Sequence, residues 1–170
     1  MKTLFNFISR SEWRFVGILT LALLVLTGLP YWYAWLTAPA NAVYNGLHAL
    51  SPGDIPVYYS YINQVKNGQI FLKDLFTSEP QNLGTFNIWW IGVGLLARFF
   101  NLSVIAAFQL ARLALIPVFM VVAYLFISYF FAAAAERKTA LFFLLFSSGL
   151  GFYTAGDLDA VDFSFAAFGF

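Results

Sequence analysis

Three acidic stretches carry the side chains of this chain that could do chemistry. Asp54 stands in SPGDIPVYY, Glu79 precedes Pro80, and Asp157 and Asp159 stand in GDLDAVD. Carboxylates can accept or donate a proton in catalysis. Their oxygens are also the ligands that hard divalent cations such as Mg²⁺ or Mn²⁺ prefer, and such a cation can bridge to a phosphate. If the stretches meet in space, they predict an acid–base centre with a metal site.

Cations would be needed wherever negative charge grows on a departing phosphate. The sequence offers Lys66, Lys73, Arg98 and Arg112 for that role and does not choose among them. It contains no cysteine, which excludes disulfides, thiolate catalysis and zinc–thiolate sites. Its net charge of only +1 gives no sign of a nucleic-acid partner.

The composition indicates that a lipid bilayer surrounds the elements that must position these residues. The chain is 61% hydrophobic, 21% aromatic and only 10% charged, whereas soluble domains are about half apolar and about a quarter charged. Residues 15–36 form the first predicted transmembrane helix, because no charge interrupts the run from Phe15 to Trp35 and about 20 apolar residues suffice to cross.

Basic residues precede this first span and orient it. Lys2, Arg10 and Arg14 stand there with Glu12 as the one acid, so the positive-inside rule places the N-terminus on the cytoplasmic side. The membrane is expected to be the cell or plasma membrane. A cleaved signal peptide is the alternative, since Ala38-Pro39-Ala40 resembles a cleavage site. The apolar run is longer than the about 7 to 15 residues of such signals.

A polar segment from Thr37 to about Gly84 follows, and the predicted external loop with its interfacial helices covers residues 37–102. Within it, Asp54 and Pro56 favour a helix start and Asn67-Gly68 a stop, which predicts a short helix from Pro56 to Lys66. Its apolar positions recur at helical spacing, so we expect it to lie along the membrane surface.

Residues 86–100 decide the topology. The stretch is apolar but shorter than a crossing needs, and it contains Gly92 and Gly94, so we expect a helix at the outer interface. The acids of all three stretches then share the external face. If the stretch crosses instead, Asp157 and Asp159 lie on the opposite side from Asp54.

Two further spans are predicted. Residues 113–135 are uncharged, Glu136-Arg137-Lys138 forms a charged turn, and residues 139–155 give a third, shorter apolar run. The fold class is therefore all-α and integral to the membrane, with about three transmembrane helices and external interfacial helices between the first two. Because the chain stops inside the apolar run FSFAAFGF, we expect a truncated N-terminal portion of a longer protein.

The order of these features resembles the start of GT-C membrane glycosyltransferases, the superfamily of oligosaccharyltransferases, protein O-mannosyltransferases and lipid A aminoarabinose transferases. The resemblance rests on a transmembrane helix, an external acid in DIPVYYSYI followed by Gly68, and then SEPQ. It implies transfer of a sugar from a polyprenyl-phosphate donor to an unknown acceptor at the external face. We expect the segment by itself to be inactive, because members of the superfamily have many more spans.

The resemblance also implies roles for single residues. Asp54 matches the acid of the first external loop, which contacts the metal or the acceptor, and would be the catalytic general base or acceptor-orienting group. Glu79 resembles the acid-proline element before the next helix. Asp157 and Asp159 occupy the place of the second acidic motif, which helps to hold a divalent metal, Mg²⁺ or Mn²⁺.

Plainer interpretations remain open for each residue. Asp54 can serve as a helix cap, Glu79 as an ordinary loop acid, and Asp157 and Asp159 as solvation of a turn in which Asp162 offers another pairing. For the chain as a whole, the alternative is a small non-enzymatic membrane protein, such as a complex subunit or part of a transporter.

Overall fold

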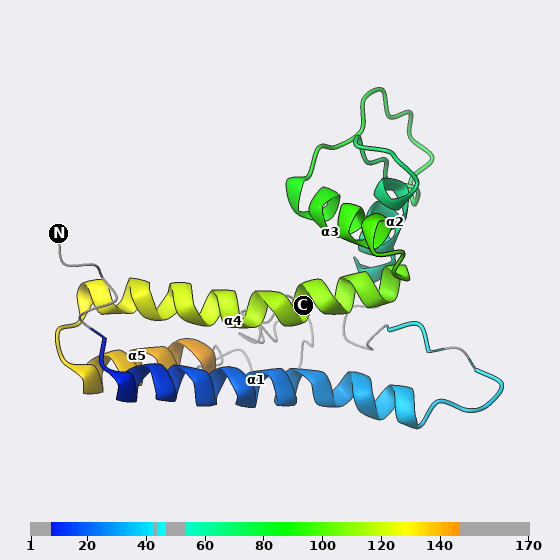
Figure 1. The fold of residues 1–170 in the computed structure, drawn as a ribbon. Helices are drawn as coiled ribbons and strands as arrows, with labels where there is room; N and C mark the ends of the chain where they lie inside the picture. Colours follow the sequence, from blue (N-terminus) through cyan, green and yellow to red (C-terminus); the bar gives the residue numbers. More distant parts are fainter. Residues whose placement is uncertain (1–7, 43, 47–53, 147–170) are drawn as a thin grey trace, which may run out of the picture. The chain divides into compact units, whose positions relative to one another are not determined.

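The computed structural model describes residues 8–42, 44–46 and 54–146. Over these residues the chain is helical apart from its turns and one isolated backbone bridge. The described helices are α1 (Arg10–Leu36), α2 (Asp54–Lys66), α3 (Ile88–Phe99), α4 (Val104–Phe130) and α5 (Ala134–Phe146) (Figure 1). Among them, α1 and α4 are long and apolar enough to cross a membrane, judged by length and composition, whereas α3 is apolar but short. The predicted all-α class is confirmed.

The chain divides into two compact units, which are described separately. The first unit comprises the residues up to Pro30 and those from Arg112 onward, and the second comprises Tyr31–Ala111. Helices α1 and α4 each contribute residues to both units. The acidic segment around Asp54 and Glu79 belongs to the second unit.

In the first unit, α1 and α4 run antiparallel. Near the start of α1, Glu12 accepts a hydrogen bond from the hydroxyl of Tyr124; further along α1, the carbonyl of Thr27 accepts one from Arg112. A later residue of α1 therefore contacts an earlier residue of α4, which defines an antiparallel pair. Consequently, Pro30 and Arg112, where the chain leaves and re-enters the first unit, lie at the same end of that unit.

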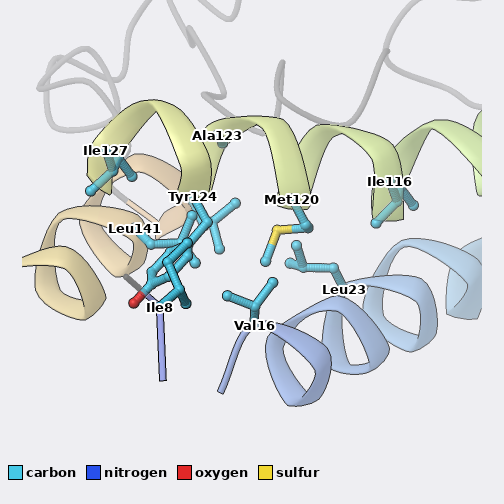
Figure 2. Packing of buried hydrophobic residues seen from close by; sticks show 10 residues of the cluster. Ile8, Val16, Leu23, Ile116, Met120, Ala123, Tyr124, Ile127 and Leu141 are labelled. Carbon is cyan, nitrogen blue, oxygen red and sulfur yellow. The ribbon is translucent and has the colours of Figure 1, made fainter. Parts of the chain in front are cut away.

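Apolar side chains from α1, α4 and α5 fill the space between these helices. In Figure 2, Val16 and Leu23 of α1 face Met120 of α4. Leu23, Met120, Tyr124, Leu141 and Leu145 are almost completely buried. Among the described residues, the buried cluster consists of Ile8, Val16, Leu23, Ile116, Met120, Ala123, Tyr124, Ile127, Leu141 and Leu145.

Helix α5 runs in the same direction as α1. Arg137, in the first turn of α5, forms an ion pair with Glu12, and the ammonium group of Lys138 lies 5.6 Å from the ring centroid of Phe15. Figure 1 shows α5 alongside α1, starting at the N-terminal end of α1. The predicted third span, 139–155, is described only as far as Phe146, where α5 ends.

The break between α4 and α5 differs from the sequence prediction. The span was expected to continue to Ala135 with a charged turn at Glu136-Arg137-Lys138. The structure ends α4 at Phe130 and places all three charged residues in the first turns of α5. The Nη1 atom of Arg137 donates to the carbonyls of Ala132 at 2.8 Å and Phe131 at 3.3 Å. This capping satisfies carbonyls that a continuing helix would have bonded itself.

The start of α4 also lies earlier than the predicted span at 113. Ser103 accepts a hydrogen bond on its hydroxyl from the backbone N–H of Ala106 at 3.2 Å, so it caps α4, which begins at Val104. The second span was predicted only for residues 113–135. The structure joins residues 104–112 to that apolar run in one helix, with Arg112 inside it.

In the second unit, α2 and α3 pack tightly against each other. Ile62 and Val65 of α2 contact the face of α3 that carries Val93, Gly94 and Ala97, all of which are buried. A Cβ atom at Gly94 would collide with the side chain of Val65, so this crossing requires glycine. The predicted helix at 56–66 is confirmed, with its start two residues earlier, at Asp54.

Both helices of this pair end in left-handed residues. Gly68, with φ +98°, follows α2, and its N–H bonds to the carbonyl of Val65 while the N–H of Gln69 bonds to that of Gln64. Asn101, with φ +51°, ends α3 in the same way. These paired bonds define the Schellman motif, which satisfies the last helix carbonyls.

The side-chain amides of two glutamines hold the backbone of the segment that joins α2 to α3. The amide of Gln64 bonds to both the N–H and the carbonyl of Lys73, each at 2.8 Å. The amide of Gln81 bonds to the N–H and the carbonyl of Asp74 in the same manner, at 2.8 and 2.7 Å. The backbone of Leu72 pairs with that of Thr85 at the base. The segment is therefore an ordered loop closed by hydrogen bonds.

Candidate functional site

Asp54 is the first residue of α2, and its carboxylate is exposed. Pro56 occupies the first turn, as expected for a helix start. Buried Ile55 and Ile62 hold the helix within the second unit. Asp54 is thus a solvent-accessible acid carried by a packed helix, and it lies where the backbone N–H groups of a helix favour negative charge.

Glu79 lies in the loop between α2 and α3. Its backbone N–H donates to the hydroxyl of Thr77 at 3.2 Å, and its side chain is exposed. The neighbouring pair formed by Gln81 and the Asp74 backbone orders this part of the loop. Glu79 is therefore available to bind a ligand from solution, on a turn whose backbone is fixed.

The metal-binding cluster predicted from the sequence lies mostly outside the described residues. Asp157 and Asp159, and with them Asp162, belong to a range that is not described. Within the described residues, no three aspartate, glutamate or histidine side chains gather as a metal site would need. Asp54 and Glu79 share the second unit, so two of the four predicted site residues belong to one folded body.

The structure distinguishes between the four basic residues that the sequence left equivalent. The ammonium group of Lys66 donates to the carbonyl of Leu102 at 2.7 Å, and Arg112 is buried and donates to the carbonyl of Thr27 at 3.3 Å. Both have structural roles. Lys73 and Arg98 are exposed, which leaves them as the cations that a soluble or lipid anion could reach.

A buried polar network in the first unit was not predicted. Oε1 of Glu12 accepts hydrogen bonds from the Tyr124 hydroxyl at 2.7 Å and from Nε of Arg137 at 2.8 Å, while Nη2 of Arg137 lies 2.7 Å from the same oxygen. Oε2 accepts from the N–H and the hydroxyl of Ser9, both at 2.8 Å. Glu12 is only 1% exposed. These contacts offset the free-energy cost of removing the Glu12 carboxylate from water.

One sequence signal for this network existed. Ser9-Glu12 has the spacing of a capping box, and the hydroxyl of Ser9 indeed accepts from the backbone N–H of Glu12 at 3.3 Å. The signal accounts for the start of α1 at Arg10, before the predicted limit at 15. It could not identify Arg137 and Tyr124 as partners, because they are more than a hundred residues away in sequence.

Tyr59 of α2 is a partly buried polar residue of the second unit. Burial, together with Tyr31 and Tyr44, raises the pKa of Tyr59 to about 12. A Cβ atom at Gly46 would lie 2.6 Å from its hydroxyl, and the ring meets Phe108 edge-on at 5.3 Å. Tyrosine is protonated at neutral pH in any case, so the raised pKa matters only above pH 10, where it keeps the phenol of Tyr59 neutral.

Comparison with protein-family models, with curated proteins and with solved structures finds no match to this chain.

Proposed function

We propose that this chain is the N-terminal part of a GT-C-like membrane glycosyltransferase. It would transfer a sugar from a polyprenyl-phosphate donor to an acceptor at the external membrane face. The proposal combines the resemblance of the acidic segments with the way the helices of the first unit are paired.

The antiparallel pairing of α1 and α4 is the observation that carries the proposal. Because the chain leaves the first unit after Pro30 and returns at Arg112 at the same end, the segment between them begins and ends on one membrane face if both helices cross. That segment contains Asp54 and Glu79. The short α3 agrees with this interpretation, since a helix of 12 residues rises only about 18 Å, well below the thickness of the hydrocarbon core.

The distribution of basic residues favours an orientation. Arg10 and Arg14 stand at the start of α1, and Arg137 and Lys138 stand at the start of α5, which lies at the same end of the first unit. Under the positive-inside rule this end faces the cytoplasm. The segment with Asp54 then departs from the opposite, external end.

Exposed apolar side chains support insertion into lipid. Only 28% of the most apolar window of α1 and 33% of that of α4 are buried within the protein. Leu21 is 63% exposed and Val122 60% exposed. A core helix of a soluble protein would be mostly covered by its own fold. In a bilayer, lipid chains would cover these apolar surfaces and keep them from water.

In the proposed reaction, Asp54 would accept the proton of the acceptor nucleophile or orient that group. Its exposed position at a fixed helix start suits either role. Glu79, Asp157 and Asp159 have the hard oxygen donors that Mg²⁺ or Mn²⁺ selects and would hold the ion. When bound, the ion would supply charge stabilisation for the departing lipid phosphate.

The test is sugar transfer by the protein expressed from its complete coding sequence. We expect Asp54→Asn to lower transfer from a polyprenyl-phosphate sugar by at least about 100-fold, in the range typical of a lost general base. Asp74→Asn is the matched control, because its side-chain oxygen can still accept the bond from the N–H of Phe76 that Asp74 accepts now, at 2.9 Å. Undiminished transfer by Asp54→Asn would exclude the catalytic role.

The exposed apolar surface also favours a second candidate, a non-enzymatic membrane subunit. Ile88 and Phe99 of α3 are 77% and 83% exposed and could pack against a partner protein. Under this alternative, the wild-type protein should transfer no sugar by itself, and it should co-purify with a defined partner from native membranes.

A further inference from the structure

Arg98 is a basic residue with an unusual setting. It lies in the last turn of α3 and is exposed, and no described residue forms a hydrogen bond or ion pair with its guanidinium group. Its Nη1 atom lies 3.3 Å from the position a Cβ atom would take on Gly68. In contrast, Lys66, two residues before Gly68, donates a hydrogen bond from its ammonium group to the carbonyl of Leu102.

The neighbours of Arg98 on the open side are apolar. Leu95, Arg98 and Phe99 line an open concavity of about 450 Å³. Leu95 is 51% exposed and Phe99 83% exposed. A guanidinium group that pairs with no acid of the described residues and is flanked by exposed hydrocarbon is complementary to an amphiphile with an anionic head and apolar chains.

The exposed side of α3 extends this surface. Ile88, Gly92, Leu95, Leu96 and Phe99 recur at helical spacing and are exposed, while the opposite side packs on α2. A helix that is apolar on both sides needs a second cover. Because only the short turn Phe100–Ser103 separates α3 from α4, a candidate span, the cover nearest in the chain is the lipid of the bilayer that α4 would cross.

We infer that Arg98, Leu95 and Phe99 form a binding site for the phosphate headgroup of a bilayer phospholipid. The guanidinium takes the phosphate oxygens in a bidentate pair of charge-assisted hydrogen bonds. Leu95 and Phe99 contact the first carbons of the acyl chains. The site anchors α3 at the depth of the headgroups and fixes the height of the second unit at the membrane surface. This inference needs a membrane but not sugar transfer, so its outcome is independent of the Asp54 experiment.

Native mass spectrometry of the purified full chain in detergent tests the site. The probes are phosphatidic acid, phosphatidylcholine with the same acyl chains, and undecaprenyl phosphate. Phosphatidic acid exposes a phosphate monoester. In phosphatidylcholine the phosphate is a diester, and the positive ammonium group of choline balances its negative charge. We expect the wild-type chain to retain phosphatidic acid about tenfold better than phosphatidylcholine.

Three variants make the result specific. Arg98→Gln should bring the preference close to one, and Arg98→Lys should keep part of it, because a point charge replaces the bidentate pair. Lys73→Gln, which removes another exposed cation of the same unit, should keep the full preference. Circular dichroism of each variant checks that the helices are intact.

Several results would overturn the inference. An unchanged preference in Arg98→Gln would show that Arg98 only complements the C-terminal ends of the helices, as a cation in a last turn can. An equal loss in Lys73→Gln would reduce the effect to general surface charge. Tighter retention of undecaprenyl phosphate than of phosphatidic acid would reassign the site from bilayer lipid to a polyprenyl lipid.

Discussion

Glu12 is a buried acid that links three segments of the first unit. Its two oxygens receive contacts from Ser9, Tyr124 and Arg137, and its side chain is removed from solvent. A buried ion pair adds little net stability compared with an apolar replacement of the whole pair, but loss of one partner leaves a buried charge uncompensated. We therefore expect the network to specify which helices pair and in which register more than to add net stability.

Removal of one partner should be strongly destabilising. We expect Glu12→Ala to lower the free energy of unfolding by about 3 to 5 kcal/mol, because it strands the Arg137 guanidinium. Thermal unfolding of the purified protein in detergent, followed by circular dichroism, measures this. Glu136→Ala is the control, since Glu136 is an exposed acid of the same helix turn as Arg137. Equal unfolding temperatures for the two variants would contradict the network's importance.

Tyr59 should make the protein sensitive to alkaline pH. Its pKa is about 12 in the folded state, against an ordinary value of 10.0. Folding thus favours the protonated phenol, and this contribution to stability is complete below pH 10 and is lost as the pH rises from 10 to 12.

Replacing Tyr59 with phenylalanine should flatten that dependence. We expect the unfolding temperature of Tyr59→Phe to fall less between pH 10 and 12 than that of the wild type. Tyr33→Phe, which alters an exposed tyrosine, should behave like the wild type. If both variants fall in parallel with the wild type, deprotonation of Tyr59 does not limit stability in this range.

The loop between α2 and α3 is held mainly by hydrogen bonds from side-chain amides to its backbone, together with one backbone bridge at its base. Gln64 is buried and bonds to both backbone groups of Lys73, which fixes the loop to α2. Gly84 permits the closing pair at the base, since its φ is +73° and a Cβ atom would lie 2.7 Å from the carbonyl oxygen of Leu72. The exposed turn with Glu79 depends on these anchors.

Loss of the first anchor should free the loop without unfolding the helices. We expect Gln64→Ala to raise amide hydrogen exchange across residues 69–87 and to speed tryptic cleavage after Lys73, because two backbone groups lose their partner at a cost of about 1 to 3 kcal/mol. Gln69→Ala, at an exposed position, is the control. Unchanged exchange in the loop would show that the Leu72–Thr85 pair alone is sufficient.

At the scale of the whole molecule, the pairing of α1 with α4 makes a prediction about topology. The loop that carries Glu79 and the turn between α4 and α5 should face opposite sides of the membrane, since α4 separates them. The chain has no cysteine, so single cysteines can report their positions without background.

Impermeant thiol labelling of intact cells tests this arrangement. We expect Ser78→Cys to label from outside and Ala133→Cys to label only after the membrane is permeabilised. Both residues are exposed, so access depends on the side of the membrane rather than on burial. The reverse pattern would invert the orientation, and labelling of both residues from outside would exclude α4 as a span.

Features that depend on neighbouring residues could be predicted from the sequence. Continuous apolar runs predicted α1 and much of α4, and Asp54, Pro56 and Gly68 predicted the ends of α2, because capping and backbone conformation are local effects. The short length of the run at 86–100 likewise predicted a short helix, and α3 has 12 residues.

Features that join distant residues became visible in the folded chain alone. The break after Phe130 lies in FAAAAERK, which contains no glycine or proline, and it depends on Arg137 capping the carbonyls of Phe131 and Ala132 while binding Glu12. The distinction between Lys66 and Arg98 is likewise invisible in sequence, because it depends on whether a backbone carbonyl lies within reach. Partner choice is a matter of distance in space, and a local pattern contains no information about that distance.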